Sequence, residues 1–357
     1  MNKISEIILR GNAYERGLQH GQQLGPQIKD FLNDNKARVN SIREFPLSDD
    51  VIQSQVQLHA AVIEAELPEI ATELKGLAAG AGISYEEAVF LQVRVELMSY
   101  GDQDLLEGDC STVAIKQPGH PTITGQTIDL PGNMTELGCV FRIIPENDDE
   151  PEILMYGFAG LLGYMGMNSH GLSININMVV SNDWQPGVSP YLLVRHFLTL
   201  ATTEECLQEL NRITRSSSRS FVIADKTSLL NVEFTATQIR VLEETLMFHT
   251  NHYLDTDLIK EDKIHFLFKN SSIKRLKLLQ QLFPSDENVS PETLFNIFAD
   301  HTLYPVGICA HGEGNIRRSE TVGTVVMEPE SFTMYARKGN ACTGETEIFR
   351  MKAHSAV

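Results

Sequence analysis

The feature that most constrains the fold of this chain is a change of pattern near residue 110. Over about the first hundred residues, apolar side chains recur every three or four positions, as in 14–31, 51–67 and 84–97, which predicts helices. Pro68 ends the second run, and the third opens with an S-x-x-E capping box. No strand is predicted here. We therefore expect an all-helical N-terminal segment.

After residue 110 the pattern changes to short β-like runs that are separated by Gly, Pro and Asn. Strands in clusters and helices in clusters favour an α+β layered fold over alternating βαβ units. The boundary falls at Asp109–Cys110, which divides the chain into 1–109 and 110–357. The predicted strands are 111–115, 122–128, 139–144, 153–156, 172–180, 220–223, 229–234, 239–242, 323–327 and 331–335, and the predicted helices are 191–200, 203–210, 273–283 and 291–299.

Composition excludes several classes of protein. With 42% apolar and 21% charged residues, the chain can form a packed core. Lys and Arg number 29 against 47 Asp and Glu, a net charge of −18, so no basic footprint for nucleic acid or anionic lipid is present. The longest uncharged apolar run, 153–167, is too short to span a bilayer, and the N-terminus lacks a signal-peptide pattern. We expect a cytoplasmic protein with no nucleic-acid or membrane partner.

Cys110 is the candidate nucleophile, although a lone cysteine before an apolar strand is by default a small buried thiol. The motifs around it decide otherwise, because their order and spacing resemble the acyl-coenzyme A:6-aminopenicillanic acid acyltransferase family, the C45 group of N-terminal-nucleophile (Ntn) hydrolases. The resemblance rests on Tyr14-Glu15-Arg16-Gly17-x-x-His20-Gly21, Cys110-Ser111-Thr112, Gly125-Gln126-Thr127-Ile128-Asp129, Gly166-Met167-Asn168-x-x-Gly171-Leu172, Glu233-Phe234, Thr250-Asn251-His252 and Ser271-Ser272-x-x-Arg275.

The resemblance implies a four-layer αββα sandwich of the Ntn-hydrolase type, made as a precursor that cuts itself between Asp109 and Cys110. Residues 1–109 would be a helical propeptide that becomes the α-chain, and 110–357 the core, or β-chain. The Cys110 thiol would attack the Asp109 carbonyl, and water would hydrolyse the resulting thioester. The liberated α-amine has an unperturbed pKa of about 7.7–8.0, against about 8.5 for the thiol, so it can accept the thiol proton.

Two further catalytic residues follow from the resemblance. Asp129 would hold the new α-amine and thiol in position; the alternative is an exposed turn residue before Pro131. Asn251 would donate a side-chain N–H to the oxyanion of the tetrahedral intermediate; the alternative is an Asx-turn residue that ends a strand.

Supporting residues are also predicted. Arg275 would either bind a carboxylate or brace a loop, and the serines of its motif are interpreted as the N-cap of a helix. Thr112, Thr127 and His252 are candidates for support or substrate binding. Thr127 and Leu130 depart from the family pattern, and both are expected on the pocket side.

Two shorter patterns complete the list. The glycine-dense stretch 160–171 predicts that its backbone either packs closely or approaches a ligand closely. The five cysteines form no CxxC pair. His249 with His252, or Cys309 with His311, lack a third ligand at a recognisable spacing, so no metal site is predicted.

The sequence thus predicts a self-activating N-terminal cysteine amidohydrolase or acyltransferase. It would act through an acyl-enzyme on a small amide, such as an N-acyl amino compound or a dipeptide-like amide, or on an acyl thioester. No cofactor is expected, with a coenzyme A thioester as an alternative acyl donor. The alternative function is an uncleaved, catalytically silent relative that binds an amide-containing ligand or partner. The oligomeric state stays open, a homo-oligomer included.

Overall fold

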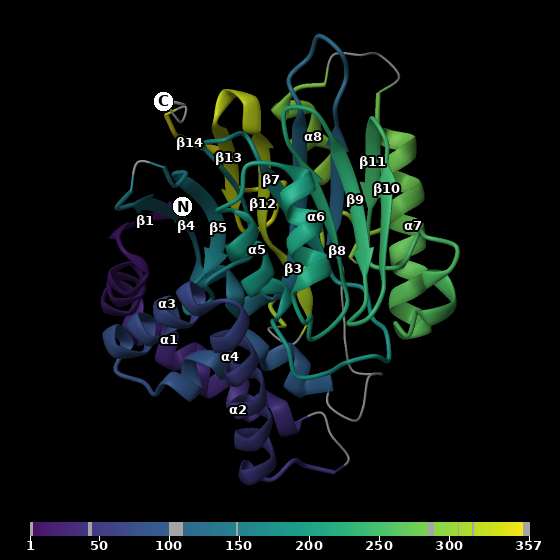
Figure 1. Ribbon diagram of the computed structural model, residues 1–357. Coiled ribbons are helices and arrows are strands. Elements are labelled where there is room, and N and C mark those ends of the chain that lie inside the picture. The colour runs from purple at the N-terminus through teal and green to yellow at the C-terminus, as the bar shows by residue number, and fades with distance from the viewer. Residues whose placement is uncertain are drawn as a thin grey trace.

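Two β-sheets lie face to face in the computed structural model, which describes residues 3–41, 45–99, 110–147, 149–284, 289–305, 307–315 and 318–352 (Figure 1). The first sheet has the strand order β1-β4-β5-β6-β7-β8-β9-β10 and the second β11-β2-β3-β12-β13-β14. The strands are β1 Ser5–Gly11, β2 Ser111–Ile115, β3 Ile123–Pro131, β4 Gly138–Pro145, β5 Ile153–Phe158, β6 Met165–Asn168, β7 Ser173–Asn177, β8 Arg219–Ala224, β9 Leu229–Phe234, β10 Ile239–Glu243, β11 Leu246–His249, β12 Ser319–Glu328, β13 Thr333–Lys338 and β14 Glu347–Arg350.

Helices cover the outer face of each sheet. The helices α5, Pro190–Phe197, and α6, Thr203–Arg212, pack on the first sheet, where Phe197 meets Phe221 of β8 edge to face. The helices α7, Phe266–Leu282, and α8, Pro291–Phe298, pack on the second. Inner strands such as β2, β8 and β9 are buried along their whole length, because one face meets helices and the other meets the opposite sheet. The predicted αββα sandwich is confirmed.

The N-terminal helices α1 Ala13–Ser41, α2 Asp49–Glu66, α3 Pro68–Ala81 and α4 Tyr85–Ser99 form a separate layer at one end of the sandwich (Figure 1). The helices α1 and α3 approach closely at glycines: a Cβ on Gly17 would lie 1.9 Å from the Glu73 carbonyl oxygen. Pro68 opens α3, as its rigid φ allows. The predicted capping box is confirmed, since the Glu87 N–H donates to Ser84 Oγ at 3.1 Å.

The expectation of an all-helical N-terminal segment is wrong. Strand β1 pairs in parallel with β4 at the edge of the first sheet, with Ser5 opposite Cys139. The strand has only seven residues and its partner lies far along the chain, so no local pattern predicted it. The segment also contacts the core through His20, whose Nε2 accepts the Gly160 N–H at 3.1 Å. Burial lowers the pKa of His20 to about 3, which keeps this acceptor neutral.

The glycine-dense stretch packs closely, as predicted. A Cβ on Gly163 would lie 2.0 Å from the Tyr191 carbonyl oxygen of α5, so only glycine permits this approach.

The short strands β6 and β14 were not predicted. Over the described part of the chain, no helix combines the length and apolar character that a bilayer crossing needs.

Candidate active site

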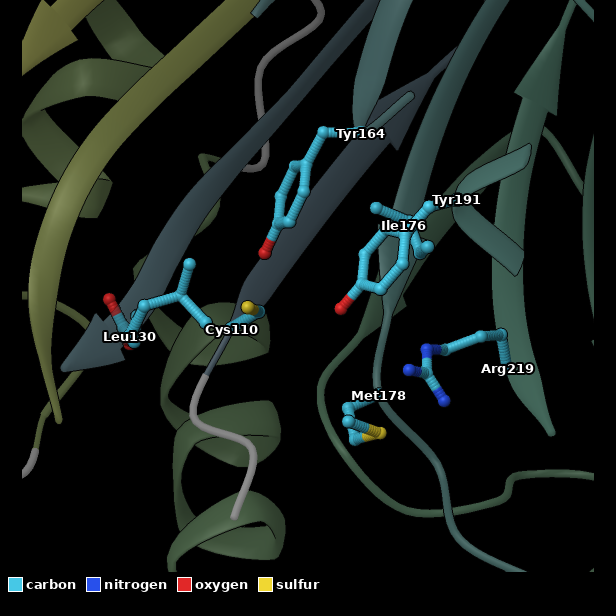
Figure 2. A pocket seen from close by; sticks show the side chains of 8 residues that line it. Cys110, Leu130, Tyr164, Ile176, Met178, Tyr191 and Arg219 are labelled. Atoms are coloured by element: carbon cyan, nitrogen blue, oxygen red, sulfur yellow. The ribbon is translucent and has the colours of Figure 1, made fainter. Parts of the chain in front are cut away.

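Cys110 lies directly before β2 and borders a cavity of about 40 Å³ between the two sheets (Figure 2). Its side chain is buried, with 5% exposed. The first sheet contributes Ile176 from β7 and Arg219 from β8, while α5 contributes Tyr191. The complete lining is Cys110, Asp129, Leu130, Tyr164, Ile176, Met178, Tyr191 and Arg219. The structure therefore brings Cys110 and Asp129 to one cavity.

Asp129 is a buried residue of β3, not an exposed turn residue, so that alternative is wrong. Its Oδ1 accepts a hydrogen bond from Thr321 Oγ1 at 2.6 Å. Thr321 lies opposite Asp129 in the β3–β12 ladder. A carboxylate on the inner side of the sandwich is thereby held at the cavity that Cys110 also lines.

Arg275 of α7 braces the nucleophile. The side chain is fully buried, and its Nη1 donates to the Cys110 carbonyl oxygen at 2.7 Å and to Ser111 Oγ at 3.0 Å. Its Nη2 donates to Asn251 Oδ1 at 3.0 Å. Of the two roles predicted for Arg275, these bonds favour the brace, because the guanidinium donates them to other residues of the protein.

Asn251 is fully buried just after β11 and does not line the cavity. Because Arg275 donates to its Oδ1, the amide nitrogen faces the other way, where Nδ2 donates to the Met178 carbonyl at 3.1 Å. The amide carries a second N–H. Met178 itself lines the cavity, so Asn251 stands immediately behind the cavity wall.

The predicted N-cap at Ser271-Ser272 is wrong. Helix α7 begins at Phe266, with His265 as its N-cap, and the two serines lie inside the helix. Ser272 Oγ instead accepts the Asn251 backbone N–H at 2.7 Å. The serine that resembles a cap in sequence therefore ties α7 to the segment that carries Asn251.

A buried pair that sequence reasoning did not assign fixes the turn after Asn251. Glu233 Oε1 contacts His249 Nε2 at 2.9 Å and accepts the Leu254 N–H at 2.7 Å, while Oε2 accepts the Asp255 N–H at 2.9 Å. Glu233 and His249 are both fully buried. The Glu233-Phe234 motif is the feature of the sequence from which the role of Glu233 could have been predicted.

Three other candidates support the framework and do not line the cavity. Thr127 Oγ1 accepts the Ser111 N–H at 3.1 Å, and Thr112 Oγ1 donates to Asn177 Oδ1 of the opposite sheet at 2.7 Å. His252 Nδ1 lies 2.7 Å from Ser272 Oγ, and burial, with His249 nearby, lowers the pKa of His252 to about 4. The pocket-side placement holds for Leu130 but is wrong for Thr127. Asp109 lies outside the described residues.

Two tyrosines and an arginine form a further part of the cavity wall. The hydroxyl groups of Tyr164 and Tyr191 point toward the space beside the Cys110 sulfur (Figure 2). Burial raises the pKa of Tyr164 well above its usual value, and the neighbouring Cys110 adds to the effect, so the phenol stays neutral. Arg94 of α4 lies 4.9 Å from the Tyr191 ring centroid, so the N-terminal layer supports this wall.

Cys309 and His311, for which no third metal ligand was predicted, have two further metal-binding types of side chain beside them. These are His301, eight residues before Cys309, and Cys342, which follows 31 residues after His311. His249 and His252, by contrast, contact Glu233 and Ser272.

The chain thus forms two face-to-face sheets that are covered by helices, with Cys110 directly before an inner strand. Residues 120–342 match the family described as acyl-coenzyme A:6-aminopenicillanic acid acyl-transferase, and the chain belongs to this family. It is therefore an enzyme of the acyltransferase and hydrolase class.

Relatives were found by sequence and by structure. A fungal acyl-coenzyme A:6-aminopenicillanic-acid-acyltransferase 40 kDa form, from Emericella nidulans, is 25% identical over 75% of this chain and 74% of its own. A beta-alanyl-dopamine/carcinine hydrolase from Drosophila melanogaster is 25% identical over 76% and 77%. Penicillin V acylase from Agrobacterium tumefaciens is 13% identical with a TM-score of 0.47, over 68% of this chain and 86% of that one. A conjugated bile acid hydrolase from Clostridium perfringens is 13% identical with a TM-score of 0.41, over 68% and 97%.

Proposed function

We propose that the chain is a self-processing N-terminal cysteine amidohydrolase or acyltransferase with Cys110 as its nucleophile. The observation that carries the proposal is the shared cavity of Cys110 and Asp129, in which no imidazole lines the described wall. A thiol without a histidine needs another base. The α-amine that Cys110 gains on cleavage is such a base, and the Asp129 carboxylate nearby would stabilise its ammonium form.

The self-cleavage step begins with the thiol of Cys110. The sulfur attacks the Asp109 carbonyl carbon, the C–N bond breaks, and the nitrogen takes the proton to become the free α-amine of Cys110. Water then hydrolyses the thioester, which leaves a carboxyl group on Asp109 and the thiol on Cys110. The cavity of about 40 Å³ has room for about one water molecule.

In turnover, the same thiol would attack the substrate carbonyl after passing its proton to the α-amine. One amide N–H of Asn251 would stabilise the oxyanion, an electrostatic contribution that is often the largest in acyl transfer. The intermediate expels the amine, which takes the proton from the ammonium group, and leaves an acyl-thioester on Cys110. Water or an acceptor amine then removes the acyl group. Arg275 fixes the Cys110 carbonyl, which limits the directions that the sulfur and the nitrogen can take.

Arg219 indicates the class of substrate. The side chain is 1% exposed and lines the cavity; Nη1 donates to the Ser218 carbonyl at 2.7 Å, whereas Nη2 has no hydrogen-bond partner among the described residues. A buried guanidinium N–H without a partner is costly, and a carboxylate is its best complement. We therefore propose a small amide that carries a carboxylate. Both sequence relatives are named for acyl transfer or hydrolysis, in agreement with this chemistry.

Intact mass of denatured protein tests the nucleophile and the maturation together. We expect fragments 1–109 and 110–357 from the wild type and a single chain from Cys110→Ala. The fragments should elute together under native conditions, because one hydrophobic core and the β1–β4 pairing join them. A wild-type chain that stays intact while it turns over amides would contradict the proposal. A chain that stays intact and binds amides without turnover would favour the silent binding protein.

A further inference from the structure

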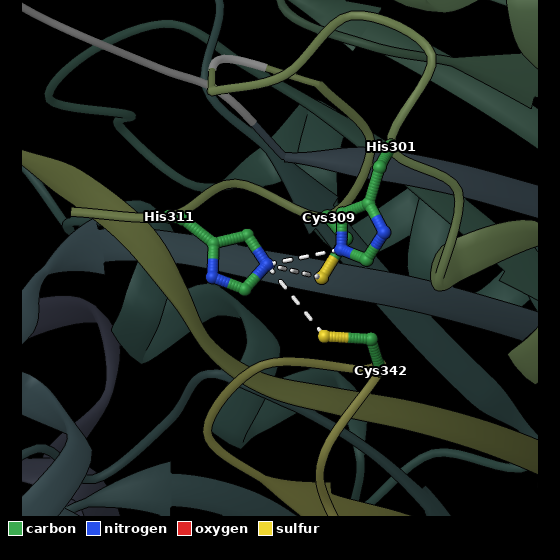
Figure 3. A group of neighbouring side chains, drawn as sticks. All are labelled: His301, Cys309, His311 and Cys342. Atoms are coloured by element: carbon green, nitrogen blue, oxygen red, sulfur yellow. Dashed lines mark hydrogen bonds between the residues drawn. The ribbon is translucent and has the colours of Figure 1, made fainter. Parts of the chain in front are cut away.

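Four metal-binding side chains converge on the far side of Thr321 from the cavity. His301 follows α8, Cys309 and His311 lie on the loop before β12, and Cys342 lies between β13 and β14 (Figure 3). Their ligand atoms all lie within 4.8 Å of one another. Two segments of the chain, the α8–β12 connection and the β13–β14 connection, thus bring two thiols and two imidazoles close together.

The distances from His311 Nε2 to the other three ligand atoms are close to those in a tetrahedral site. His311 Nε2 lies 3.5 Å from Cys309 Sγ, 3.6 Å from Cys342 Sγ and 3.0 Å from His301 Nε2. Bonds of about 2.3 Å from zinc to sulfur and about 2.0–2.1 Å to nitrogen place S and N about 3.6 Å apart at the tetrahedral angle, and two nitrogens about 3.3 Å apart. The observed distances agree with these values to within a few tenths of an ångström.

Hydrogen bonding alone does not account for the cluster. One imidazole nitrogen has either a single N–H or a single lone pair, so His311 Nε2 can satisfy only one of its three polar neighbours. Thiols are weak donors and weak acceptors, which makes the arrangement poorer still. A cation at the centre would bind all four groups through lone pairs.

We propose that His301, Cys309, His311 and Cys342 bind one structural zinc ion. Two sulfurs and two nitrogens form a donor set that zinc favours. All four positions are filled by protein, which is typical of structural and not of catalytic zinc. The ion would tie the loop before β12 to the β13–β14 connection.

The proposed ion would also stabilise the position of Asp129, a consequence that rests on the proposed function. Ala310, between two of the ligands, donates its N–H to Thr321 Oγ1 at 2.9 Å and accepts the Thr321 N–H at 3.0 Å. Thr321 Oγ1 in turn donates to Asp129 Oδ1 at 2.6 Å. The loop that the zinc would hold is therefore hydrogen-bonded directly to Thr321, the partner of the cavity carboxylate.

Metal analysis of the full-length, reduced protein tests the site. We expect about one zinc per chain by plasma mass spectrometry after desalting. Cys309→Ala should lower that content at least tenfold, whereas Cys206→Ala, at an equally buried cysteine, should leave it unchanged. Because Cys342 and His301 are exposed, Cys342→Ser and His301→Gln should stay folded and also lose the metal. A chelator should lower Tm in the wild type but not in Cys342→Ser.

Three results would overturn the zinc proposal. The first is a wild-type chain that holds no zinc after incubation with zinc and desalting. The second is zinc retained in both Cys309→Ala and Cys342→Ser. The third is a Cys309–Cys342 disulfide in peptide maps of protein unfolded without reductant. Cobalt(II) gives an independent check, since thiolate ligation should produce sulfur-to-metal charge-transfer bands that Cys342→Ser loses.

Thr321→Val tests the link to Asp129 separately. We expect this variant to keep its zinc and to process more slowly than the wild type, and Thr321→Ser to restore the rate. Normal processing of Thr321→Val would contradict the proposed link between the zinc site and Asp129, without contradicting the zinc site itself. Zinc binding in a chain that never cleaves would instead contradict the proposed function alone.

Discussion

Cys110 and Cys309 are both buried, yet their surroundings differ in kind. Around Cys110 the described cavity wall holds tyrosine hydroxyls, a carboxylate and a guanidinium, and no imidazole. Around Cys309 lie two imidazoles and a second thiol. In the proposed mechanism the Cys110 thiol needs a base other than histidine, whereas the Cys309 thiol lies among groups that could share a metal ion with it. We therefore expect the two buried thiols to react differently, because their neighbours differ.

Alkylation compares the two cysteines directly and should give the largest effect. Iodoacetamide should label Cys110 of mature protein and abolish turnover, while Cys342, although exposed, should react only after a chelator removes zinc. Burial raises the pKa of Cys139 and Cys206 far above the usual value, so both should stay unmodified. Peptide mass mapping reads all sites at once. Full activity with Cys110 completely labelled would contradict the role of Cys110 as nucleophile. Equal labelling of Cys342 with and without the chelator would contradict its role as a metal ligand.

Asn251→Ala should produce the next largest effect. Loss of one oxyanion donor should lower kcat about 10²–10³-fold, with little change in KM, because the oxyanion exists only in the transition state. Steady-state kinetics of mature protein measures this. Asn211→Ala, at an exposed position on α6, is the matched control. A near-normal kcat would remove Asn251 from the catalytic residues.

Arg219→Gln should have a smaller effect that depends on the substrate. If Arg219 binds a carboxylate, KM for an acidic amide should rise about 10–100-fold, the value of a charge-assisted hydrogen bond, while KM for the neutral carboxamide analogue should stay nearly constant. Arg212→Gln, at an exposed arginine, provides the control. Equal changes for both substrates would argue against carboxylate recognition.

Much of the fold could be predicted because its signals are local. Strand β2 coincides with the predicted run 111–115, and Pro68 and the Ser84–Glu87 capping box mark helix boundaries where expected. Strand β1 could not be predicted, because its stability comes from pairing with β4 and not from its own pattern. The start of α7 was misplaced for a related reason: Ser272 serves Asn251 through a tertiary hydrogen bond.

The candidate site also contains residues that could be predicted from local motifs and residues that could not. Cys110, Asp129 and Asn251 were accessible from motifs in the sequence, since each stands in a short recognisable string. The brace from Arg275 to the Cys110 carbonyl, and the inclusion of Arg219 in the wall, depend on α7 and β8 packing against distant strands.

Local patterns in the sequence locate the change from helices to strands and the cysteine at that boundary, because helix and strand periodicity act over a few residues. The placement of Cys342 beside His301, Cys309 and His311, and the link from Thr321 to Asp129, came from the folded structure alone. Cys342 meets the α8–β12 connection only when the second sheet has formed, and no local pattern records that contact.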